Sequence, residues 1–590
     1  MNKKQAFSLF LSLVLFFSAG TSLAQSTDEL EFNIDASSPG IPLPRIYKPS
    51  IDLSGRGAHR DLTWPQTLAA KGILETWQAD LGFANFYRLQ YNLWEVEQLA
   101  KDKAARDKLL DNYESVIKQI SDSGGVIILN LFGTPSGLGK VLDKNSAVHN
   151  LKKYKQLVKD TIRRLSCEKK YNIWYELWNA PDLEDFYLGE RSEYLNLYRI
   201  VAEAVKELRQ EAKMHIPLGG PATSSWFANI QPNDILTPER SLIYELIKYC
   251  YSYKLPLDFI SWHAYSSDPE LEKQLSIYKK PFIKLIREWL SYFHFESSMP
   301  LIIDEWNFDA AANISSKRGK EAYVTASFIP ARLKSMQEAG VDYQTYFCLE
   351  DFGGNKEGVN RNLGVFSFDG QERSDYKVYA KAGYNTFRML NLLGNELLPS
   401  PPADVFAGII PTRSQDYLAV LVYNYIDPQA AMNYLSRSIV DLNSAERKYI
   451  INIIKSDRIE KILSGQLDLS TLRLPAKARN MLKSAIEINN LVTKFSAANR
   501  KIKISFKGVK DIYLLSRYTV DSSCSRDCAF KVSDEQEVDF SQGYSQTIEM
   551  SPYSVQLLVF KKKPLPAVVE VKPAASAPAE EPVKNAENKP

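Results

Sequence analysis

The chain has 590 residues, which is more than one ordinary domain needs and enough for two or three. Hydrophobic residues account for 45% of the chain and aromatic residues for 12%, so it can bury a large core. The 73 basic and 70 acidic residues nearly cancel, and the formal net charge is +3. This balance lacks the basic excess of a nucleic-acid-binding protein, so nucleic acid is not an expected partner.

Residues 1–24 have the pattern of a secretory signal peptide. Lys3 and Lys4 open the segment, residues 6–19 are apolar, and small residues at 22 and 24 precede the expected cleavage site. A membrane anchor is the alternative, but the apolar run is short, and no later run is long and apolar enough to span a bilayer. We therefore expect an exported protein, periplasmic or secreted, with no membrane span.

The five cysteines suit such a location. Cys524 and Cys528 are close together in a polar loop, and we predict a small disulfide between them in an oxidising compartment. Cys167, Cys250 and Cys348 have apolar neighbours and are expected to be buried thiols. The chain has only five histidines, none with ligand spacing to a cysteine pair, so no metal site is predicted.

Strand and helix patterns alternate over residues 44–395, after a polar, proline-rich lead-in at 25–43. The predicted strands are Ile46–Leu53, Ala84–Tyr91, Val126–Phe132, Ile173–Trp178, Ile216–Gly220, Phe259–Ala264, Leu301–Glu305 and Tyr343–Leu349. The predicted helices include Ala104–Ser121, Asn150–Leu165, Glu193–Ala212, Glu239–Tyr251, Glu270–Tyr292, Ala322–Ala339 and Ser374–Leu393. This alternation predicts an α/β fold, a (β/α)₈ barrel. A doubly wound open sheet is the alternative, but it would not place so many aromatic and carboxylate residues at successive strand ends.

Residues 403–563 are rich in strand patterns instead. A helical stretch at about 433–499 interrupts them, and we interpret it as an insertion that contacts a protein partner or the substrate. The last segment, 564–590, is rich in Pro, Ala, Glu and Lys, which predicts a disordered tail and a second candidate for partner contact. The predicted strands of this region are Tyr417–Tyr425, Lys501–Phe506, Tyr513–Tyr518 and Ser554–Phe560.

The most informative stretch is Trp174-Tyr-Glu-Leu-Trp-Asn-Ala-Pro-Asp182. A bulky, apolar strand ends in a loop that Pro181 begins, so Asn179 stands at the carboxyl end of the strand, where barrels carry their chemistry. The stretch resembles the fourth-strand signature of clan A retaining glycoside hydrolases, Trp-x-x-Glu-x-Trp-Asn-Glu-Pro-Asn/Asp. The closest resemblance is to family 39, which includes β-xylosidases, α-L-iduronidase and exopolysaccharide-operon glycosidases. It spans roughly residues 45–395 and implies a β-sandwich after the barrel.

The chain departs from that signature at one position. The general acid/base Glu of the family is Ala180 here, and alanine cannot transfer a proton. Three interpretations stay open: a natural pseudoenzyme that still binds glycan, replacement by a nearby acid such as Asp182, Glu184 or Asp185, or an engineered acid/base knockout. Assistance by a general acid/base is worth typically about 10²–10⁴-fold in rate, so the loss is severe for unactivated glycosides.

The resemblance implies a nucleophile at Glu305, in Leu301-Ile-Ile-Asp-Glu-Trp-Asn307 at the end of the seventh strand. Hydrolysis with retention needs a carboxylate that attacks the anomeric carbon and a second carboxyl about 5–5.5 Å away. A capping or salt-bridged surface acid is the alternative for Glu305. The reaction uses only carboxylates and water, so no cofactor is implied.

Five further positions match substrate-binding or supporting residues of the family. Asn179 would bind the sugar 2-hydroxyl, although a turn asparagine is the alternative. His263 and Tyr265, in a Ser-x-His-x-Tyr motif at the sixth strand, would face the pocket, and Tyr265 would hydrogen-bond the nucleophile. Arg88 on the second strand would keep Glu305 ionised, and Trp306 is the first choice for a ring that stacks on sugar.

The preferred hypothesis is an exported family 39-like glycoside hydrolase that acts on a polysaccharide or oligosaccharide by retention. The alternative is a catalytically inactive glycan-binding or polysaccharide-assembly protein with the same fold. The residue at position 180 separates them, because Glu there in close relatives would mark this chain as a variant, whereas consistent loss would favour the binder.

The signal-peptide hypothesis leads to a first prediction. Export should remove residues 1–24, because the small side chains of Ser22 and Ala24 fit the cleavage-site pattern. N-terminal sequencing of the exported protein should begin at Gln25. An intact Met1 in the exported fraction would contradict the prediction.

Overall fold

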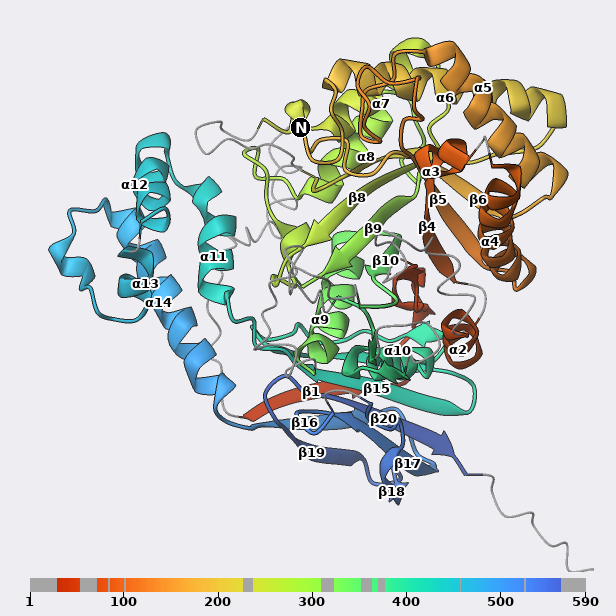
Figure 1. Cartoon of the computed structure of the whole chain (residues 1–590). Helices are drawn as coiled ribbons and strands as arrows, with labels where there is room; N and C mark the ends of the chain where they lie inside the picture. The colour runs from red at the N-terminus through yellow and green to blue at the C-terminus, as the bar shows by residue number, and fades with distance from the viewer. Residues whose placement is uncertain are drawn as a thin grey trace, which may run out of the picture.

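The structure, a computed structural model, describes residues 29–53, 72–82, 85–99, 102–226, 237–308, 323–351, 363–369, 377–456, 458–524 and 527–563. The expected signal peptide and the expected C-terminal tail lie outside these ranges. Three parts are visible in Figure 1: an α/β barrel, a β-sandwich beside it, and a group of helices that projects to one side.

Eight parallel strands close into a barrel in the order β10-β3-β4-β5-β6-β7-β8-β9, which confirms the predicted fold class. Their side chains are buried almost throughout, because helices cover the outer face and side chains fill the interior. This double burial is why the strands appear in the sequence as near-continuous apolar runs. The bounds are β3 (Ile51–Asp52), β4 (Phe86–Asn92), β5 (Val126–Phe132), β6 (Ile173–Leu177), β7 (Leu218–Thr223), β8 (Phe259–Tyr265), β9 (Leu301–Asn307) and β10 (Tyr343–Phe347).

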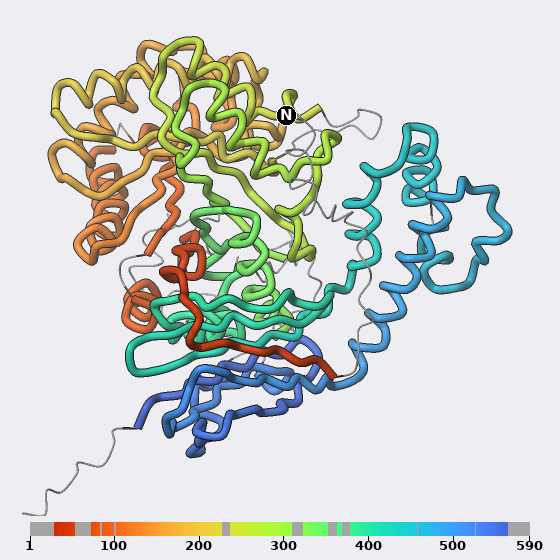
Figure 2. Tube along the Cα trace, turned by 180° about the vertical axis from the view of Figure 1, so that it is seen from behind, coloured from red at the N-terminus to blue at the C-terminus, as the bar shows by residue number. Residues whose placement is uncertain are grey.

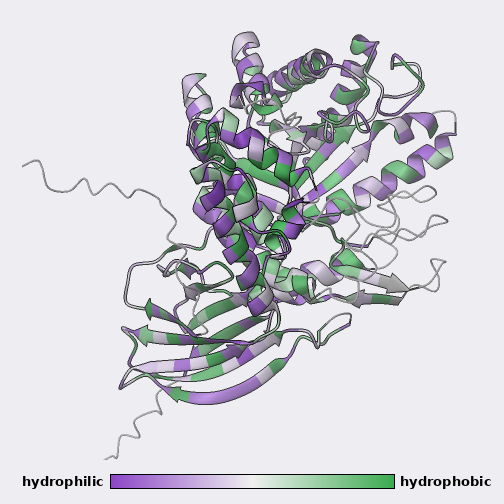
Figure 3. Ribbon diagram, turned by 90° about the vertical axis from the view of Figure 1, so that its left-hand side faces the viewer, coloured by the Kyte–Doolittle hydropathy of each residue, from purple (hydrophilic) through white to green (hydrophobic). Residues whose placement is uncertain are grey.

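Hydrophobic and hydrophilic residues alternate along most of the covering helices (Figure 3), whereas α9 is buried along most of its length. None of the helices within the described ranges is both long and apolar enough to cross a membrane. Their bounds are α2 (Ile73–Leu81), α3 (Leu93–Gln98), α4 (Lys103–Asp122), α5 (Leu151–Ile162), α6 (Arg191–Ala212), α7 (Leu242–Tyr253), α8 (Phe282–Tyr292), α9 (Val324–Ala339) and α10 (Ala382–Asn391).

Several predicted boundaries were wrong for identifiable reasons. The helix expected over Glu270–Tyr292 is only α8, because Pro281 stands at its N-cap and the preceding chain forms a short 3₁₀ turn and a loop. The helix expected from Ser374 begins at Ala382, after the strand β12 (Lys377–Ala380), which pairs with β11 (Phe366–Asp369). Of the strand expected over Ile46–Leu53, only β3 is extended.

The sandwich consists of a seven-stranded and a three-stranded sheet. On β15, alternate residues face different partners. Leu418 and Val420 belong to the core between the two sheets, whereas Ala419 and Leu421 belong to the core shared with the barrel. The large sheet runs β18 (Val532–Asp539), β17 (Ile512–Val520), β20 (Val555–Lys562), β15 (Tyr417–Asn424), β14 (Ala407–Arg413), β13 (Glu396–Leu397) and β2 (Ile41–Pro42), and the small sheet runs β1 (Glu29–Asp35), β16 (Arg500–Lys507) and β19 (Tyr544–Met550).

The segment expected as an extended lead-in contributes strands to both sheets. β1 pairs in parallel with β16, from Glu29 opposite Lys501 to Asp35 opposite Lys507, and β2 pairs with β13. Figure 2 shows the N-terminal strand running alongside the C-terminal strands. The alternation in β1 places Phe32 and Ile34 in the sandwich core. The sandwich is therefore built from both ends of the described chain.

The helical insertion lies between β15 and β16 and consists of α11 (Ala430–Ser438), α12 (Ser444–Ile454), α13 (Arg458–Leu463) and α14 (Ala476–Ser496). These helices pack around their own apolar core, which includes Leu435, Ile450 and Leu482. Polar contacts join the insertion to the loop that follows β8. Asn433 Nδ2 donates to Ser267 Oγ at 3.2 Å, and Arg437 forms an ion pair with Asp268. Helix α11 thus joins the insertion to a loop at the carboxyl ends of the barrel strands.

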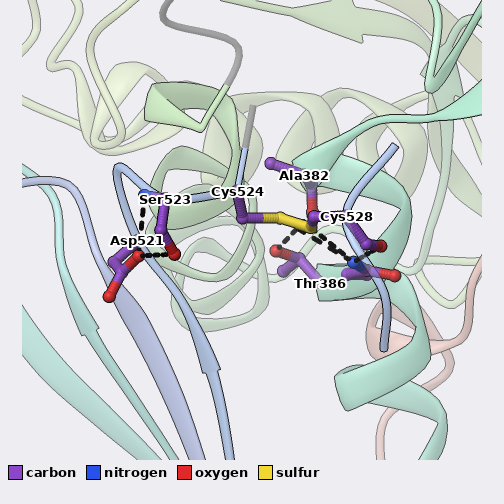
Figure 4. Close-up of a disulfide and its surroundings, with 7 residues drawn as sticks. Ala382, Thr386, Asp521, Ser523, Cys524 and Cys528 are labelled. Carbon is purple, nitrogen blue, oxygen red and sulfur yellow. Dashed lines mark hydrogen bonds between the residues drawn. A yellow bond between two sulfur atoms is a disulfide. The ribbon is translucent and has the colours of Figure 1, made fainter. Parts of the chain in front are cut away.

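A disulfide joins Cys524 and Cys528 beside helix α10 (Figure 4). Asn385 of α10 donates an Nδ2 hydrogen bond to the carbonyl oxygen of Cys528 at 3.0 Å, which holds the loop against the barrel. Cys250 and Cys348 are buried free thiols and Cys167 is a half-buried one.

The disulfide leads to a second prediction. Denatured, unreduced mature protein should titrate three thiols, and reduced protein five, because only Cys524 and Cys528 are bonded. Replacing both by serine should lower the free energy of unfolding by at most about 2 kcal/mol, since the closed loop is short. Five reactive thiols without reduction would contradict the bond.

Candidate active site

Arg88 organises the interior of the barrel. Its fully buried guanidinium, presented by β4, meets side chains from several other strands. Nε donates to Glu176 Oε2 at 2.9 Å, Nη1 donates to Asp52 Oδ2 at 3.1 Å, and Nη2 donates to Asn179 Oδ1 at 2.7 Å. Nη1 also pairs with Glu305 Oε1. Asn179 and Glu305 therefore bond to one guanidinium and belong to one site.

An irregularity in β9 brings two successive acids into this site. Ile303 pairs with Trp262 on β8, but the next β8 residue, His263, pairs with Glu305, so Asp304 is an extra residue on that side. The pairing with β10 is irregular over the same residues. Such a bulge breaks the alternation of faces. Asp304 and Glu305 both lie within 4 Å of Arg88, although strict alternation would separate them.

The sixth barrel strand places two groups on Glu305. Tyr265 donates its hydroxyl to Glu305 Oε2 at 2.8 Å, and His263 Nδ1 lies 3.4 Å from the same oxygen. Burial raises the pKa of Glu305, although Arg88 and the Tyr265 hydrogen bond oppose this rise. We expected Arg88 to keep Glu305 ionised, and its cationic charge acts in that direction but does not fully offset burial. Burial and then Glu305 raise the pKa of Tyr265 well above its usual value, so its hydroxyl keeps its proton.

Glu176 is fully buried and has a supporting role in the geometry. Ser261 Oγ donates to its Oε1 at 2.7 Å, and Asn130 Nδ2 donates to its Oε2 at 2.8 Å. Burial opposes ionisation, but Arg88 and these hydrogen bonds hold the pKa of Glu176 below its usual range. A buried, ionised carboxylate with this many donors cannot serve as a proton donor at the strand tip.

Ala180 is buried, and its backbone adopts a positive φ of 46°. Its N–H donates to the carbonyl oxygen of Ala222 at 2.9 Å, which fixes the loop against β7. Among the nearby acids, Asp182 accepts from the backbone N–H of Ser224 at 2.8 Å and from its hydroxyl at 2.6 Å, so it acts as a brace between loops. Glu184 and Asp185 are exposed. Burial raises the pKa of Asp182, although the hydrogen bonds from Ser224 oppose this rise.

The expectation that Trp306 stacks on sugar was wrong. Its side chain is fully buried, it packs against Phe328 and Tyr346, and its Nε1 donates to Gln344 Oε1 at 2.8 Å. Because Trp306 follows Glu305 on the strand, it points out of the barrel toward α9. The sequence interpretation also missed Asp52, Asp304 and Asn130, whose positions depend on the strand register.

A cavity of about 930 Å³ lies at the opposite end of the barrel, among residues that precede or begin strands, such as Asn172, Pro217 and Pro300. It contains none of the groups around Arg88. No cluster of metal-ligating side chains is found within the described ranges. The carboxyl end of the barrel, with its buried acids and Tyr265, is the candidate active site.

A closed parallel barrel that holds acids at the carboxyl ends of its strands has its active site at that end, and glycoside hydrolysis uses such acids. The sequence model of the family described as "Glycosyl hydrolases family 39" matches residues 132–426, which is half of the chain. The chain belongs to glycosyl hydrolase family 39.

Two relatives are β-xylosidases. The protein from Caldicellulosiruptor saccharolyticus is 27% identical over 250 residues, and the match covers 38% of this chain and 47% of that one. The protein from Geobacillus stearothermophilus is 25% identical over 256 residues, with 41% and 45% covered. The match thus spans less than half the length of these curated relatives.

Solved structures extend the likeness in fold to nearly the whole chain. A family 39 enzyme from Xanthomonas axonopodis pv. citri superimposes with a TM-score of 0.58 at 16% identity and covers 90% of this chain and 97% of that one. A β-xylosidase from Caulobacter crescentus superimposes with a TM-score of 0.56 at 15% identity, with 90% and 99% covered.

Arg88 leads to a third prediction. Arg88→Met should lower the free energy of unfolding by about 3–5 kcal/mol near neutral pH, because it leaves buried carboxylates without their cation. In the variant, the pKa values of the buried carboxyls around position 88 rise above their values in the unfolded chain. The variant therefore keeps its stability at low pH, where these carboxyls are protonated, and loses it as pH rises. Urea unfolding of the variant and the unchanged protein should therefore differ less at acidic than at neutral pH.

The matched control is Arg163→Met. Arg163 pairs with Asp160 and Glu211 on the surface, and its side chain is 34% exposed. Its loss should cost no more than about 1 kcal/mol. An equal loss for Arg88→Met at both pH values would show that Arg88 does not compensate buried acids.

Proposed function

We propose that this chain is an exported glycoside hydrolase that cleaves O-glycosidic bonds of a polysaccharide or oligosaccharide with retention, and that its proton transfer is impaired. The observation that carries the proposal is the placement of Glu305, held by Arg88 and Tyr265 at the end of the seventh barrel strand, with Asn179 on the same guanidinium. The β-xylosidase relatives make β-xylosides the first substrates to test.

In this mechanism Glu305 attacks the anomeric carbon as the bond to the leaving oxygen breaks, and a glycosyl ester forms. Tyr265 donates to one oxygen of Glu305 and Arg88 pairs with the other, so both steady the carboxylate before attack and as it leaves. Asn179 accepts from Arg88 through Oδ1, which leaves its Nδ2 to donate to a sugar hydroxyl.

The impaired step is protonation of the leaving group. Position 180 offers only a methyl group, and burial and Arg88 hold the pKa of His263 well below its usual value, so His263 is no imidazolium acid at neutral pH. Leaving groups that depart as stable anions need no proton. The chain therefore suits activated glycosides better than ordinary ones.

The second candidate is a glycan-binding or polysaccharide-assembly protein, which Ala180 itself favours. Its sugar contacts would be the same, because Asn179 and Tyr265 do not depend on position 180, and the fully buried Arg88 holds Asn179 in place. The helical insertion, joined to the loop after β8 by Asn433 and Arg437, is the surface we propose for contact with a protein partner or with a long glycan.

The fourth prediction tests these candidates. An aryl β-xyloside, and then a panel of other aryl glycosides, should give one burst of released phenol and then stall, because no base activates water to release the intermediate. Azide should restore turnover and give a glycosyl azide of retained configuration. Ala180→Glu should restore hydrolysis in water, by about 10²–10⁴-fold.

Glu305→Gln is the control, because it removes the nucleophile with little change in shape and should abolish both the burst and the azide product. Asp182→Asn should keep both the burst and the azide product, since Asp182 braces Ser224 and does not attack the sugar. If azide gives no product and Ala180→Glu stays inert on glycans that the protein binds, the hydrolase proposal fails and the binding protein takes its place.

A further inference from the structure

The site contains more acid than its cation can balance. Glu176 lies 2.8 Å from Arg88, Asp304 lies 3.6 Å away, and Glu305 is in direct contact. The three side chains are 0%, 0% and 7% exposed. In the part of the chain that the structure describes, no other Lys or Arg lies within 4 Å of these three acids. Asp52 pairs with the same guanidinium at 3.1 Å, so four buried acids surround one positive charge. Such an excess of negative charge is costly in a dry interior, and a proton should be retained there.

Asp304 is the acid with the least support for a negative charge. Neither of its carboxyl oxygens receives a hydrogen bond from the groups around it. Arg88 Nε and His263 Nε2 are each 3.6 Å from Oδ2, and Thr345 donates to the backbone oxygen of Asp304 instead of its side chain. By contrast, Glu176 accepts from Arg88, Asn130 and Ser261.

We infer that Asp304 is held as the neutral carboxylic acid, that it donates its proton in a hydrogen bond to Glu176, and that it thereby acts as a positioning residue for Glu305. A protonated Asp304 makes a hydrogen bond by donating, which it needs because no neighbouring group donates to its carboxyl oxygens. Glu176 can accept this further bond because a carboxylate has about four lone-pair sites. Among these three acids, the negative charge is left on Glu176 and on Glu305.

The electrostatics of the surrounding groups agree with this arrangement. Burial, and next the charge of Glu176, raise the pKa of Asp304 well above its usual value. His263 is not a competing cation, because burial and Arg88 depress its pKa. The titratable and charged groups that face Asp304 or its partners are Asp52 on β3, Arg88 on β4, Glu176 on β6, His263 and Tyr265 on β8, and Glu305 on β9.

A neutral Asp304 matters because it is next to Glu305 in the bulge of β9. An ionised Asp304 would repel the Glu305 carboxylate and compete for Arg88. The effect on a nucleophile rests on the proposed function, whereas the protonation state of Asp304 does not.

Infrared spectroscopy tests the protonation state without any activity. At a pH above the value of about 6 to which burial raises the pKa of Asp427, the protein should show the carbonyl stretching band of a protonated carboxylic acid. Asp304→Asn should weaken that band by the contribution of one aspartic acid. Glu176→Gln should make it disappear at lower pH, because the negative neighbour that raises the pKa of Asp304 is gone.

Asp342→Asn is the matched control, since it removes an aspartate that pairs with Arg287 at 2.6 Å outside the site, and the band should remain. A sample labelled with ¹³C at the aspartate carboxyl should shift the band, and this needs no mutation if a variant fails to fold. A band that Asp304→Asn does not weaken, or of which no part shifts on aspartate labelling, would overturn the inference. Buried glutamates such as Glu272, whose pKa burial also raises, contribute only the part that does not shift.

Thermal stability gives an independent measure. A raised folded-state pKa contributes stability below the unfolded value of about 3.9, and this contribution is lost as pH rises. Asn cannot ionise, so the Tm of Asp304→Asn minus that of the unchanged protein should increase from acidic to alkaline pH. A difference that is flat or decreases with pH would contradict a neutral Asp304.

The pH profile tests the positioning role. The azide-dependent rate should fall at alkaline pH as Asp304 loses its proton, and Asp304→Asn should abolish that fall, whereas Asp304→Ala should lower the rate at all pH values. An alkaline fall that survives in Asp304→Asn would overturn the role. If the infrared band behaves as expected but no aryl glycoside is cleaved, the proposed function fails and the protonation state stands.

Discussion

The structure of the site depends on one buried guanidinium. Arg88 pairs with acids from the first, fourth and seventh barrel strands and with the loop asparagine Asn179, so strands that are remote in sequence share a single charge centre. A buried cation without these acids, or the acids without the cation, would be strongly destabilising. The register of the barrel and the integrity of the site therefore depend on the same contacts, whatever residue stands at position 180.

The rest of the molecule supports that centre from outside. The large sheet of the sandwich packs one face on the small sheet and the other on the barrel, which explains why β15 is apolar on both faces. The disulfide loop lies against α10, and the helical insertion contacts the loop after β8. These contacts hold peripheral elements against the outside of the barrel, while the acids around Arg88 are buried inside it.

Much of the fold could be predicted from periodicity. The buried run Val126–Phe132 matched its strand in full, and the alternation of strands and helices was sufficient for a barrel. Residues that stand at strand ends, such as Asn179, His263 and Tyr265, were also placed near Glu305 correctly. The errors arose where local pattern and tertiary context compete. Pro281 shortened a helix, and Trp306, although next to Glu305, faces the outer core.

The sequence by itself determined the elements, the residues available at the strand ends, and the absence of a carboxyl at position 180. Only the tertiary structure decided which acids share Arg88. A bulge in β9 turns Asp304 and Glu305 to the same side, and no periodic pattern contains that information, because the bulge exists only in the pairing with β8 and β10. The pairing of β1 with β16 was likewise invisible, since strand partners separated by hundreds of residues are selected by the packed core they complete.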